Sequence, residues 1–297
     1  MSKFEKPCLI ISSPRSGSKL LRDLLMESGE FNCYPYDINY VWMHGFMDKS
    51  DDELSASEFN QSNAEYIRGY LLRLLRDNPE ARILEKTVSN GLRLDYVLKI
   101  IPEARIIHLI RDGREVTASI KSCWFEPVYS EKNQDWKLLF QKLSNFPLRS
   151  AGSYLSSYIR NNLPKLFGDR CVKSWGPRFK GMDQMLQDES LVEVCATQWA
   201  RSVSQTNAVL EDLVDSSSYI EIRYEDLLEN PSQKIAEISA FLELNAECTN
   251  RMTLWAFGNF RKISGNWESI FDLNERSLAM PILEKELSRF GYVCYKY

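Results

Sequence analysis

The most constraining feature of the chain lies near its N-terminus, where an apolar run gives way to small polar residues. Residues 9–11 are apolar, residues 12–19 read SSPRSGSK, and leucines then recur at helical spacing. This order predicts a buried strand, a tight turn and the start of a helix. Backbone N–H groups at such a helix start, together with the helix dipole, form a cradle for phosphate. The Arg15 side chain and the hydroxyls of Ser16 and Ser18 would complete an anion site.

The same segment departs from the phosphate loop of nucleotide triphosphatases. That motif has Gly, four residues and then Gly-Lys-Ser/Thr, whose last hydroxyl binds magnesium. Here Ser12 stands at the first glycine, Ser18 at the lysine and Lys19 at the metal-binding hydroxyl. We therefore expect the loop to hold phosphate without a metal ion, which argues against ATP hydrolysis.

Strand-like and helix-like patterns alternate along the rest of the chain. Buried strands are indicated at 82–85, 105–110 and 219–222, and helices at 67–75, 94–101, 114–122, 192–213 and 231–242. This alternation predicts an α/β fold, a three-layer sandwich with a central parallel β-sheet like that of P-loop nucleotide triphosphatases. Ligands of such sheets bind beyond the carboxyl ends of the strands, so we expect the loops there to share one crevice. These loops start at Ser12, Glu85, Arg111 and Arg223.

Length and composition limit the class of protein. The 297 residues suit a single domain, 1–297, with an aromatic, mostly helical insertion at about 124–190. The net charge of −4 argues against a nucleic-acid binder. The chain has no apolar run near the roughly 18 residues that span a bilayer and no apolar signal core before its first strand, so we expect a cytoplasmic protein. Seven scattered cysteines without a CxxC pair and only two histidines argue against a metal centre. Oligomeric state has no signal in the sequence.

Four short segments carry polar residues at the expected strand ends, in a recurring order. They are residues 13–18, residues 84–87, residues 108–119, in which Arg111 and Ser119 are eight apart, and residues 223–227 with Pro231. Together they resemble the sulfotransferases that use 3′-phosphoadenylyl sulfate (PAPS), and in motif style the tyrosylprotein, carbohydrate and bacterial branches. The first segment is similar to the family's 5′-phosphosulfate loop and the third to its 3′-phosphate motif. The second is similar to a lysine-bearing segment, and the last to one whose tyrosine lies near the adenine.

The resemblance implies that a sulfuryl group moves from PAPS, the co-substrate, to a hydroxyl or amine by in-line transfer, with no metal expected. Arg111 and Ser119 would bind the 3′ phosphate, and Tyr224 would lie near the adenine. Arg15 and Lys86 would stabilise charge on the leaving phosphate. The 5′ phosphate would sit on the backbone of the first loop, at Ser16, Gly17, Ser18, Lys19 and Leu20. Lys19 departs from the Ser or Thr that the family usually has there.

The acceptor also needs a general base within hydrogen-bond reach. The tyrosylprotein branch carries a carboxylate whose position, counted from Arg15 with a one-residue shift, falls on Asp37. His44 is the second candidate and Glu85 the third. Residues 261–267 resemble the loop that closes over the donor in several branches, which adds Lys262 and Ser264 as donor contacts.

Two other functions fit parts of this pattern. One is a P-loop kinase-like phosphotransferase that uses ATP, for which Asp112 is the suggestive magnesium ligand. The other is a non-catalytic nucleotide-binding module. Donor binding measured with and without a chelator separates the first from a sulfotransferase, and acceptor turnover separates the second.

Several of these residues also have plainer interpretations. Arg111 could belong to a solvated turn closed by its own salt bridge, Asp37 could cap a turn, and Lys86 could be a surface lysine. Tyr224 could be a packing residue. His108 is expected to be hydrogen-bonded within the sheet, and Trp199 to lie in the core.

The acceptor is expected to be a small or partly apolar molecule. Aromatic residues gather in the segments 34–46 and 124–179, which we expect to line its pocket. A long sulfated polysaccharide would be a poor match for an acidic chain.

Overall fold

The computed structural model describes residues 4–125, 175–261 and 267–292. Most of the expected insertion at about 124–190 therefore lies outside the described residues. Lys262 and Ser264 lie outside them as well.

Within the described residues, five parallel strands form one sheet in the order β2-β3-β1-β4-β5. They are β1 (Cys8–Ser12), β2 (Phe31–Asn32), β3 (Arg82–Glu85), β4 (Arg105–Ile110) and β5 (Tyr219–Arg223). In register, Ser12 lies opposite Leu109, and Ile110 lies opposite Arg223. The carboxyl ends of the three strands β1, β4 and β5 therefore lie side by side, as the sequence predicted for their loops. The α/β fold with a central parallel sheet is confirmed.

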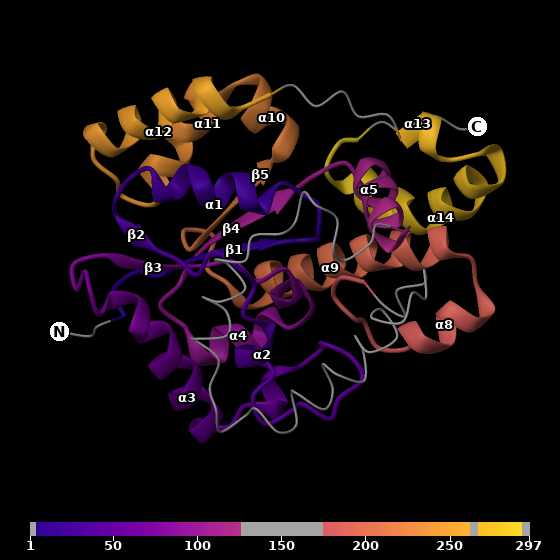
Figure 1. Cartoon of the computed structure of the whole chain (residues 1–297), viewed down its shortest axis with the longest axis horizontal. Coiled ribbons are helices and arrows are strands. Elements are labelled where there is room, and N and C mark those ends of the chain that lie inside the picture. Colours follow the sequence, from indigo (N-terminus) through magenta and orange to yellow (C-terminus); the bar gives the residue numbers. More distant parts are fainter. Residues whose placement is uncertain (1–3, 126–174, 262–266, 293–297) are drawn as a thin grey trace.

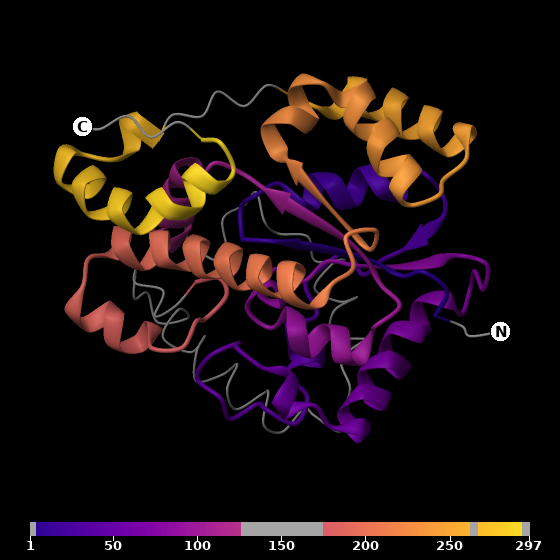
Figure 2. The ribbon, with the colours of Figure 1, turned by 180° about the vertical axis from the view of Figure 1, so that it is seen from behind.

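Helices cover both faces of this sheet. Figures 1 and 2 show α1 (Ser18–Met26), α10 (Tyr224–Glu229), α11 (Pro231–Phe241) and α12 (Ala246–Asn259) on one side. On the other side lie α2 (Asn39–Trp42), α3 (Gln61–Leu71), α4 (Leu94–Ile100) and α9 (Leu191–Leu213). Beside the sheet stand α5 (Gly113–Phe125), α8 (Met182–Asp188), α13 (Trp267–Ile270) and α14 (Leu273–Arg289).

The strands alternate their side chains between two separate cores. In β1, Leu9 and Ile11 pack into the core of α3 and α4, whereas Cys8 and Ile10 pack into the core of α1 and α11. Successive side chains of a strand point to opposite faces, so an unbroken apolar run marks a strand buried on both sides. A third core joins α5, α9 and α14, and it contains Trp199, which is fully buried as expected.

The helices α12, α13 and α14 were not among the expected elements, and α8 was expected only as part of the mostly helical insertion. Three shorter features also differ from the expectation. The two-residue strand β2 and the four-residue helix α2 lie at 31–42, where the sequence indicated neither a strand nor a helix. Helix α10 begins directly at Tyr224, where a loop was expected after β5. Its first turn carries Glu225 and Asp226, which the helix dipole favours, and Pro231 then starts α11 at its first position. None of the described helices is long and apolar enough to cross a membrane.

Candidate functional site

The loop between β1 and α1 turns on two residues with left-handed backbone. Arg15 has a φ of 65° and Gly17 a φ of 90°. A Cβ atom at Gly17 would lie 2.3 Å from Cε2 of Tyr224. The Tyr224 ring therefore packs directly on the loop backbone, and glycine is the residue that both the conformation and the contact allow.

Residues predicted from three separate segments meet at this loop. Arg15 Nε donates to Ser119 Oγ at 2.9 Å. Arg111 Nη1 donates to the carbonyl oxygen of Arg15 at 3.0 Å, and the Arg111 guanidinium lies 5.0 Å from the centroid of the Tyr224 ring. The four side chains thus form one cluster beyond the carboxyl ends of β1, β4 and β5. Because Arg15 touches Ser119 directly, one anion could contact both of them, although the sequence assigned them to different phosphates.

The start of α1 presents backbone rather than side-chain donors. Its N-cap residue is Gly17, which has no side chain to cap the helix, and the first turn holds no acidic residue. The Ser16 hydroxyl is buried and lies 2.6 Å from the hydroxyl of Ser13, so it forms its hydrogen bond within the loop. The sequence had instead predicted that this hydroxyl completes an anion site. Ser18 is 5% exposed, whereas Lys19 is exposed. An uncapped helix start with free amide donors is a suitable place for an anion.

The turn after β4 is fixed by the surrounding elements. Asp112 pairs with Arg114, whose Nη2 lies 2.6 Å from Asp112 Oδ2. The amide of Asp112 donates to Glu225 Oε1 at 3.0 Å, and the Tyr292 hydroxyl donates to Glu225 Oε2 at 2.7 Å. The carboxylate of Glu225 thus fastens the Arg111 turn to α10. The ion pair expected within a solvated turn is present, between Asp112 and Arg114, but the turn is also held from outside by Glu225, and the Arg111 side chain is 12% exposed.

Trp199 of α9 also contacts the turn after β4. Its Nε1 donates to the carbonyl oxygen of Arg111 at 3.2 Å, and a Cβ at Gly113 would lie 2.7 Å from its ring. Sequence reasoning placed Trp199 in the core but missed this contact, and it missed Glu225 and Tyr292 altogether. Glu225 lies inside a segment that the sequence singled out. Tyr292 gave no signal, because it lies 67 residues beyond its partner Glu225.

Asp37 and Lys86, two of the expected catalytic residues, form an ion pair. Lys86 Nζ donates to Asp37 Oδ1, and the amide of Val88 lies 3.4 Å from Asp37 Oδ2. The Lys86 side chain is 11% exposed and that of Asp37 32% exposed. They meet because β2 and β3 are parallel neighbours, so the chain that leaves each strand emerges at the same edge of the sheet.

The other two candidate bases have different surroundings. Glu85 is 2% exposed and accepts hydrogen bonds from Trp42 Nε1 at 3.0 Å, Thr87 Oγ1 at 2.5 Å and Asn90 Nδ2 at 2.9 Å. Burial raises the pKa of this carboxyl. Its contacts are those of a structural acceptor that fixes the turn after β3.

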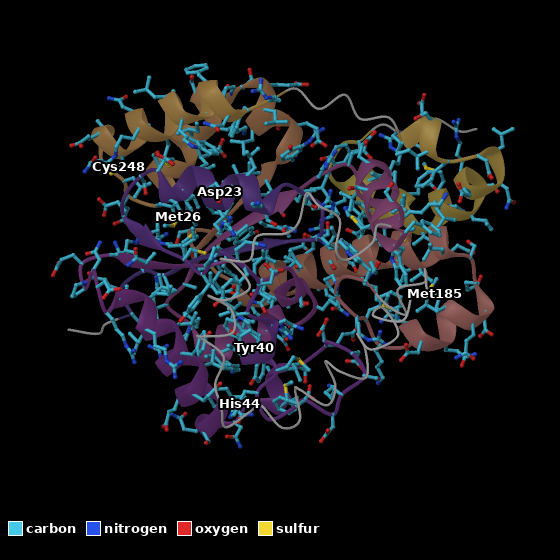
Figure 3. The ribbon with its side chains drawn as sticks, viewed as in Figure 1. Asp23, Met26, Tyr40, His44, Met185 and Cys248 are labelled. Carbon is cyan, nitrogen blue, oxygen red and sulfur yellow. The ribbon has the colours of Figure 1, made fainter. Side chains whose placement is uncertain are left out.

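His44 follows α2 and stacks on Tyr66 of α3, with ring centroids 3.7 Å apart. Burial lowers its pKa. Figure 3 shows His44 beyond Tyr40, on the side of α2 away from the strands. His108, which the sequence placed in the sheet, is buried there with its Nδ1 3.3 Å from Glu221 Oε1. Among the described residues, no three His, Cys, Asp or Glu side chains are grouped so as to hold a metal ion.

Residues 7–149 match the model of a protein family described as "Sulfotransferase family". This match covers the loop after β1, the Asp37–Lys86 pair and the Arg111 turn. Nodulation protein NoeE of Sinorhizobium fredii is 25% identical over 139 residues, which are 42% of this chain and 33% of that protein. The chain thus spans about a third of the length of this curated relative.

Solved sulfotransferases share the architecture of the whole chain. Sulfotransferase STF9 from Mycobacterium avium superposes with a TM-score of 0.59 at 14% identity, over 100% of this chain and 79% of that one. The sulfotransferase domain from the curacin biosynthetic pathway gives a TM-score of 0.50 at 16% identity, over 99% and 100% of the two chains. A sulfotransferase from Alicyclobacillus acidocaldarius gives 0.50 at 11% identity, over 96% and 94%. The resemblance seen in the sequence is confirmed: residues 7–149 match the sulfotransferase family, and the chain has the sulfotransferase fold.

Proposed function

We propose that this protein transfers a sulfuryl group from PAPS to the hydroxyl or amine of a small acceptor. The observation that carries the proposal is the convergence of Arg15, Arg111, Ser119 and Tyr224 on the uncapped start of α1. PAPS offers two phosphate groups and an adenine, and this cluster offers cations, backbone amides and an aromatic ring.

Each part of the donor has a candidate partner. The amides at the start of α1, from Ser16 to Leu20, would hold the 5′ phosphate. Arg111, which the Arg15 carbonyl and Tyr224 orient, would hold the 3′ phosphate with Ser119, because a guanidinium can bind phosphate through two parallel hydrogen bonds. Tyr224 would contact the adenine.

The transfer is an in-line displacement at sulfur. The acceptor oxygen or nitrogen forms a bond to sulfur while the bond from sulfur to the bridging phosphate oxygen breaks, and that oxygen takes the electron pair. Asp37 would accept the proton that the acceptor loses. Arg15 and Lys86 would stabilise the charge that grows on the leaving phosphate. In a loose transition state, such positioned charges supply most of the catalysis.

Nucleotide binding tests this proposal most directly. Thermal unfolding would be followed with adenosine 3′,5′-bisphosphate and with ATP, each with magnesium or with a chelator. At a hundredfold excess over its Kd, a specific ligand adds about 2.7 kcal/mol to the free energy of unfolding. We expect adenosine 3′,5′-bisphosphate to give this gain in the free energy of unfolding, with or without the chelator. In Arg111→Ala we expect most of the gain to be lost. A shift with magnesium and ATP alone would instead support the kinase-like function. That outcome is disfavoured by the ion pair that holds Asp112 to Arg114.

Turnover separates an enzyme from a nucleotide-binding module. Transfer of labelled sulfate from PAPS to an acceptor, measured on the same preparation that binds the bisphosphate, would establish the reaction. Binding without transfer to any acceptor would support the non-catalytic function.

The contact of Glu225 with the Arg111 turn gives a further prediction. Glu225→Ala removes the acceptor of the Asp112 amide and of the Tyr292 hydroxyl, so the turn loses its tie to α10. Losing such bonds costs about 1–3 kcal/mol, and we expect the Kd of the bisphosphate to rise about tenfold as the Arg111 side chain loses its position. Titration calorimetry measures this. Glu229→Ala, an exposed position on the same helix, is the control. Equal Kd values for the two variants would show that Glu225 does not position the turn.

A further inference from the structure

A pocket of about 300 Å³ opens beside Asp37, between α2 and the segment that follows it. Tyr40, Met43, Phe46 and Met47 supply its apolar wall. Tyr40 and Met43 are 7% and 5% exposed, so this part of the wall is firmly packed. The pocket thus joins an apolar surface to the carboxylate that would accept the acceptor's proton.

The polar part of the lining is dominated by carboxylates. Two cations line the pocket, and both already have acidic partners outside it: Lys49 pairs with Glu58 at 2.9 Å, and Arg178 pairs with Asp183. Asp51, in contrast, accepts from a neutral donor, the amide of Glu53, at 3.1 Å.

Asp52 also lines the pocket, and its two carboxylate oxygens are engaged by neutral donors. It accepts from Asn39 Nδ2 at 2.8 Å, from Ser89 Oγ at 3.1 Å and from the amide of Arg178 at 2.8 Å. Asp37 is already paired with Lys86. The buried guanidinium of Arg93 lies beside Asp52, where it donates to the Asp52 carbonyl oxygen and to Asn39 Oδ1. This leaves Asp51, which accepts from a backbone amide, as the lining carboxylate whose charge opposes an anionic guest.

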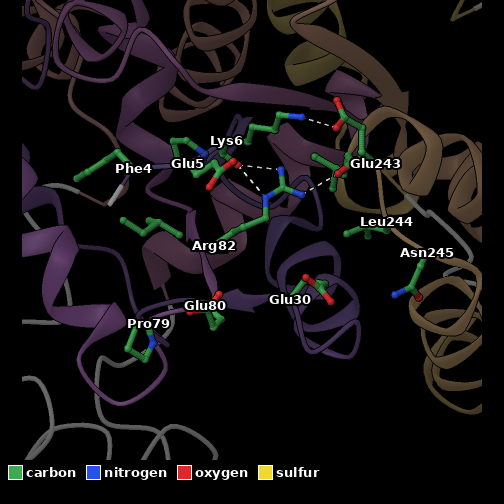
Figure 4. A pocket seen from close by; sticks show the side chains of 14 residues that line it. Phe4, Glu5, Lys6, Glu30, Pro79, Glu80, Arg82, Glu243, Leu244 and Asn245 are labelled. Atoms are coloured by element: carbon green, nitrogen blue, oxygen red, sulfur yellow. Dashed lines mark hydrogen bonds and ion pairs between the residues drawn. The ribbon is translucent and has the colours of Figure 1, made fainter. Parts of the chain in front are cut away.

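A second pocket of about 350 Å³ has a different position and chemistry. It lies at the amino ends of β1 and β3, among Lys6, Arg82 and Glu243 (Figure 4). Arg82 donates there to the carbonyl oxygens of Lys6 and Leu242, and Lys6 pairs with Glu243. Because it opens at the opposite edge of the sheet from Asp37, it is not placed to hold an acceptor for the proposed transfer.

We propose that the pocket beside Asp37 binds the acceptor, and that this acceptor is a small phenol or alcohol with an apolar body and a neutral or positive charge. The inference rests on the proposed sulfuryl transfer and adds its substrate class. The apolar wall would hold the body of the acceptor, and its hydroxyl would reach Asp37. The carboxylate of Asp51 would repel an acceptor that carries a carboxylate of its own.

Three phenols of similar size test the charge preference: 4-ethylphenol, tyramine and 4-hydroxyphenylacetate. With PAPS as donor, we expect kcat/KM for the neutral and the cationic phenol to exceed that for the anionic one by about tenfold. Equal or better use of 4-hydroxyphenylacetate would overturn the inference, and so would turnover of none of the three by protein that binds the bisphosphate.

Two variants connect the preference to the pocket. Asp51→Asn is expected to reduce several-fold the ratio of kcat/KM for tyramine to kcat/KM for 4-hydroxyphenylacetate. Asp48→Asn, at a nearby exposed position outside the lining, is expected to leave this ratio unchanged. Phe46→Ala is expected to raise KM for all three phenols without changing the Kd of the bisphosphate. An unchanged ratio in Asp51→Asn together with an unchanged KM in Phe46→Ala would place the acceptor elsewhere. Failure of the bisphosphate to bind wild-type protein would instead refute the proposed function itself.

Discussion

Replacement of Gly17 by alanine is expected to raise the Kd for adenosine 3′,5′-bisphosphate by roughly a hundredfold. Two causes act together. The φ of 90° strains any residue with a Cβ, and this Cβ would lie 2.3 Å from the ring of Tyr224. The ring must move away, and Arg111, which lies over it, loses its support. Titration calorimetry and thermal unfolding measure the loss.

Other glycines in the chain separate the two causes. Gly181 has nearly the same backbone, with a φ of 88°, but no atom of the residues that the structure describes lies within 4 Å of its added Cβ. Gly181→Ala therefore carries the backbone strain without the clash, and it should leave nucleotide binding intact. Gly69→Ala, in α3 and also without a close neighbour, controls for the substitution itself.

A double variant tests the clash directly. In Gly17→Ala/Tyr224→Ala the ring is absent, so part of the binding lost in Gly17→Ala should return relative to that single variant. If Gly17→Ala bound the bisphosphate as tightly as the wild type, the packing of Tyr224 on the loop would have no part in shaping the site.

Removal of the Lys86 charge is expected to lower kcat by about 10²–10³-fold with little change in the Kd of the bisphosphate. Lys86→Met keeps much of the length and apolar character of the side chain, which is only 11% exposed. The variant therefore loses the ammonium that would stabilise the leaving phosphate. Asp37→Asn is expected to lower kcat by about 10²–10⁴-fold, because an amide cannot accept the acceptor's proton at this step.

The ion pair makes the combined variant informative. If Asp37 and Lys86 act as a unit, the fold-loss of kcat in Asp37→Asn/Lys86→Met should be far smaller than the product of the fold-losses in the two single variants. Single-turnover rates measured with saturating PAPS give the comparison. Lys99→Met, at an exposed position on α4, controls for loss of one positive charge. A kcat in Lys86→Met equal to that of Lys99→Met would exclude Lys86 from the chemistry.

The strand, turn and helix at residues 8–26 could be predicted because each part depends on near neighbours. Apolar residues in sequence, a Pro-Arg-Ser-Gly turn and leucines at helical spacing are all local signals. Local signals also predicted β4 and the turn after it, and so placed Arg111 at a strand end. The helix α10 was missed because Tyr224–Glu229 is too short to show a periodic pattern, and β2 was missed because two residues cannot show alternation.

The sequence by itself determined the order of β1, β3, β4 and β5, the longer helices between them and the chemical groups at those strand ends, since these follow from periodicity and turn residues. Only the tertiary structure decided which groups meet. Asp37 reaches Lys86 because β2 lies beside β3, and Arg15 reaches Ser119 because β1 lies beside β4. Strand order depends on packing between segments far apart in the chain, and no local pattern encodes it.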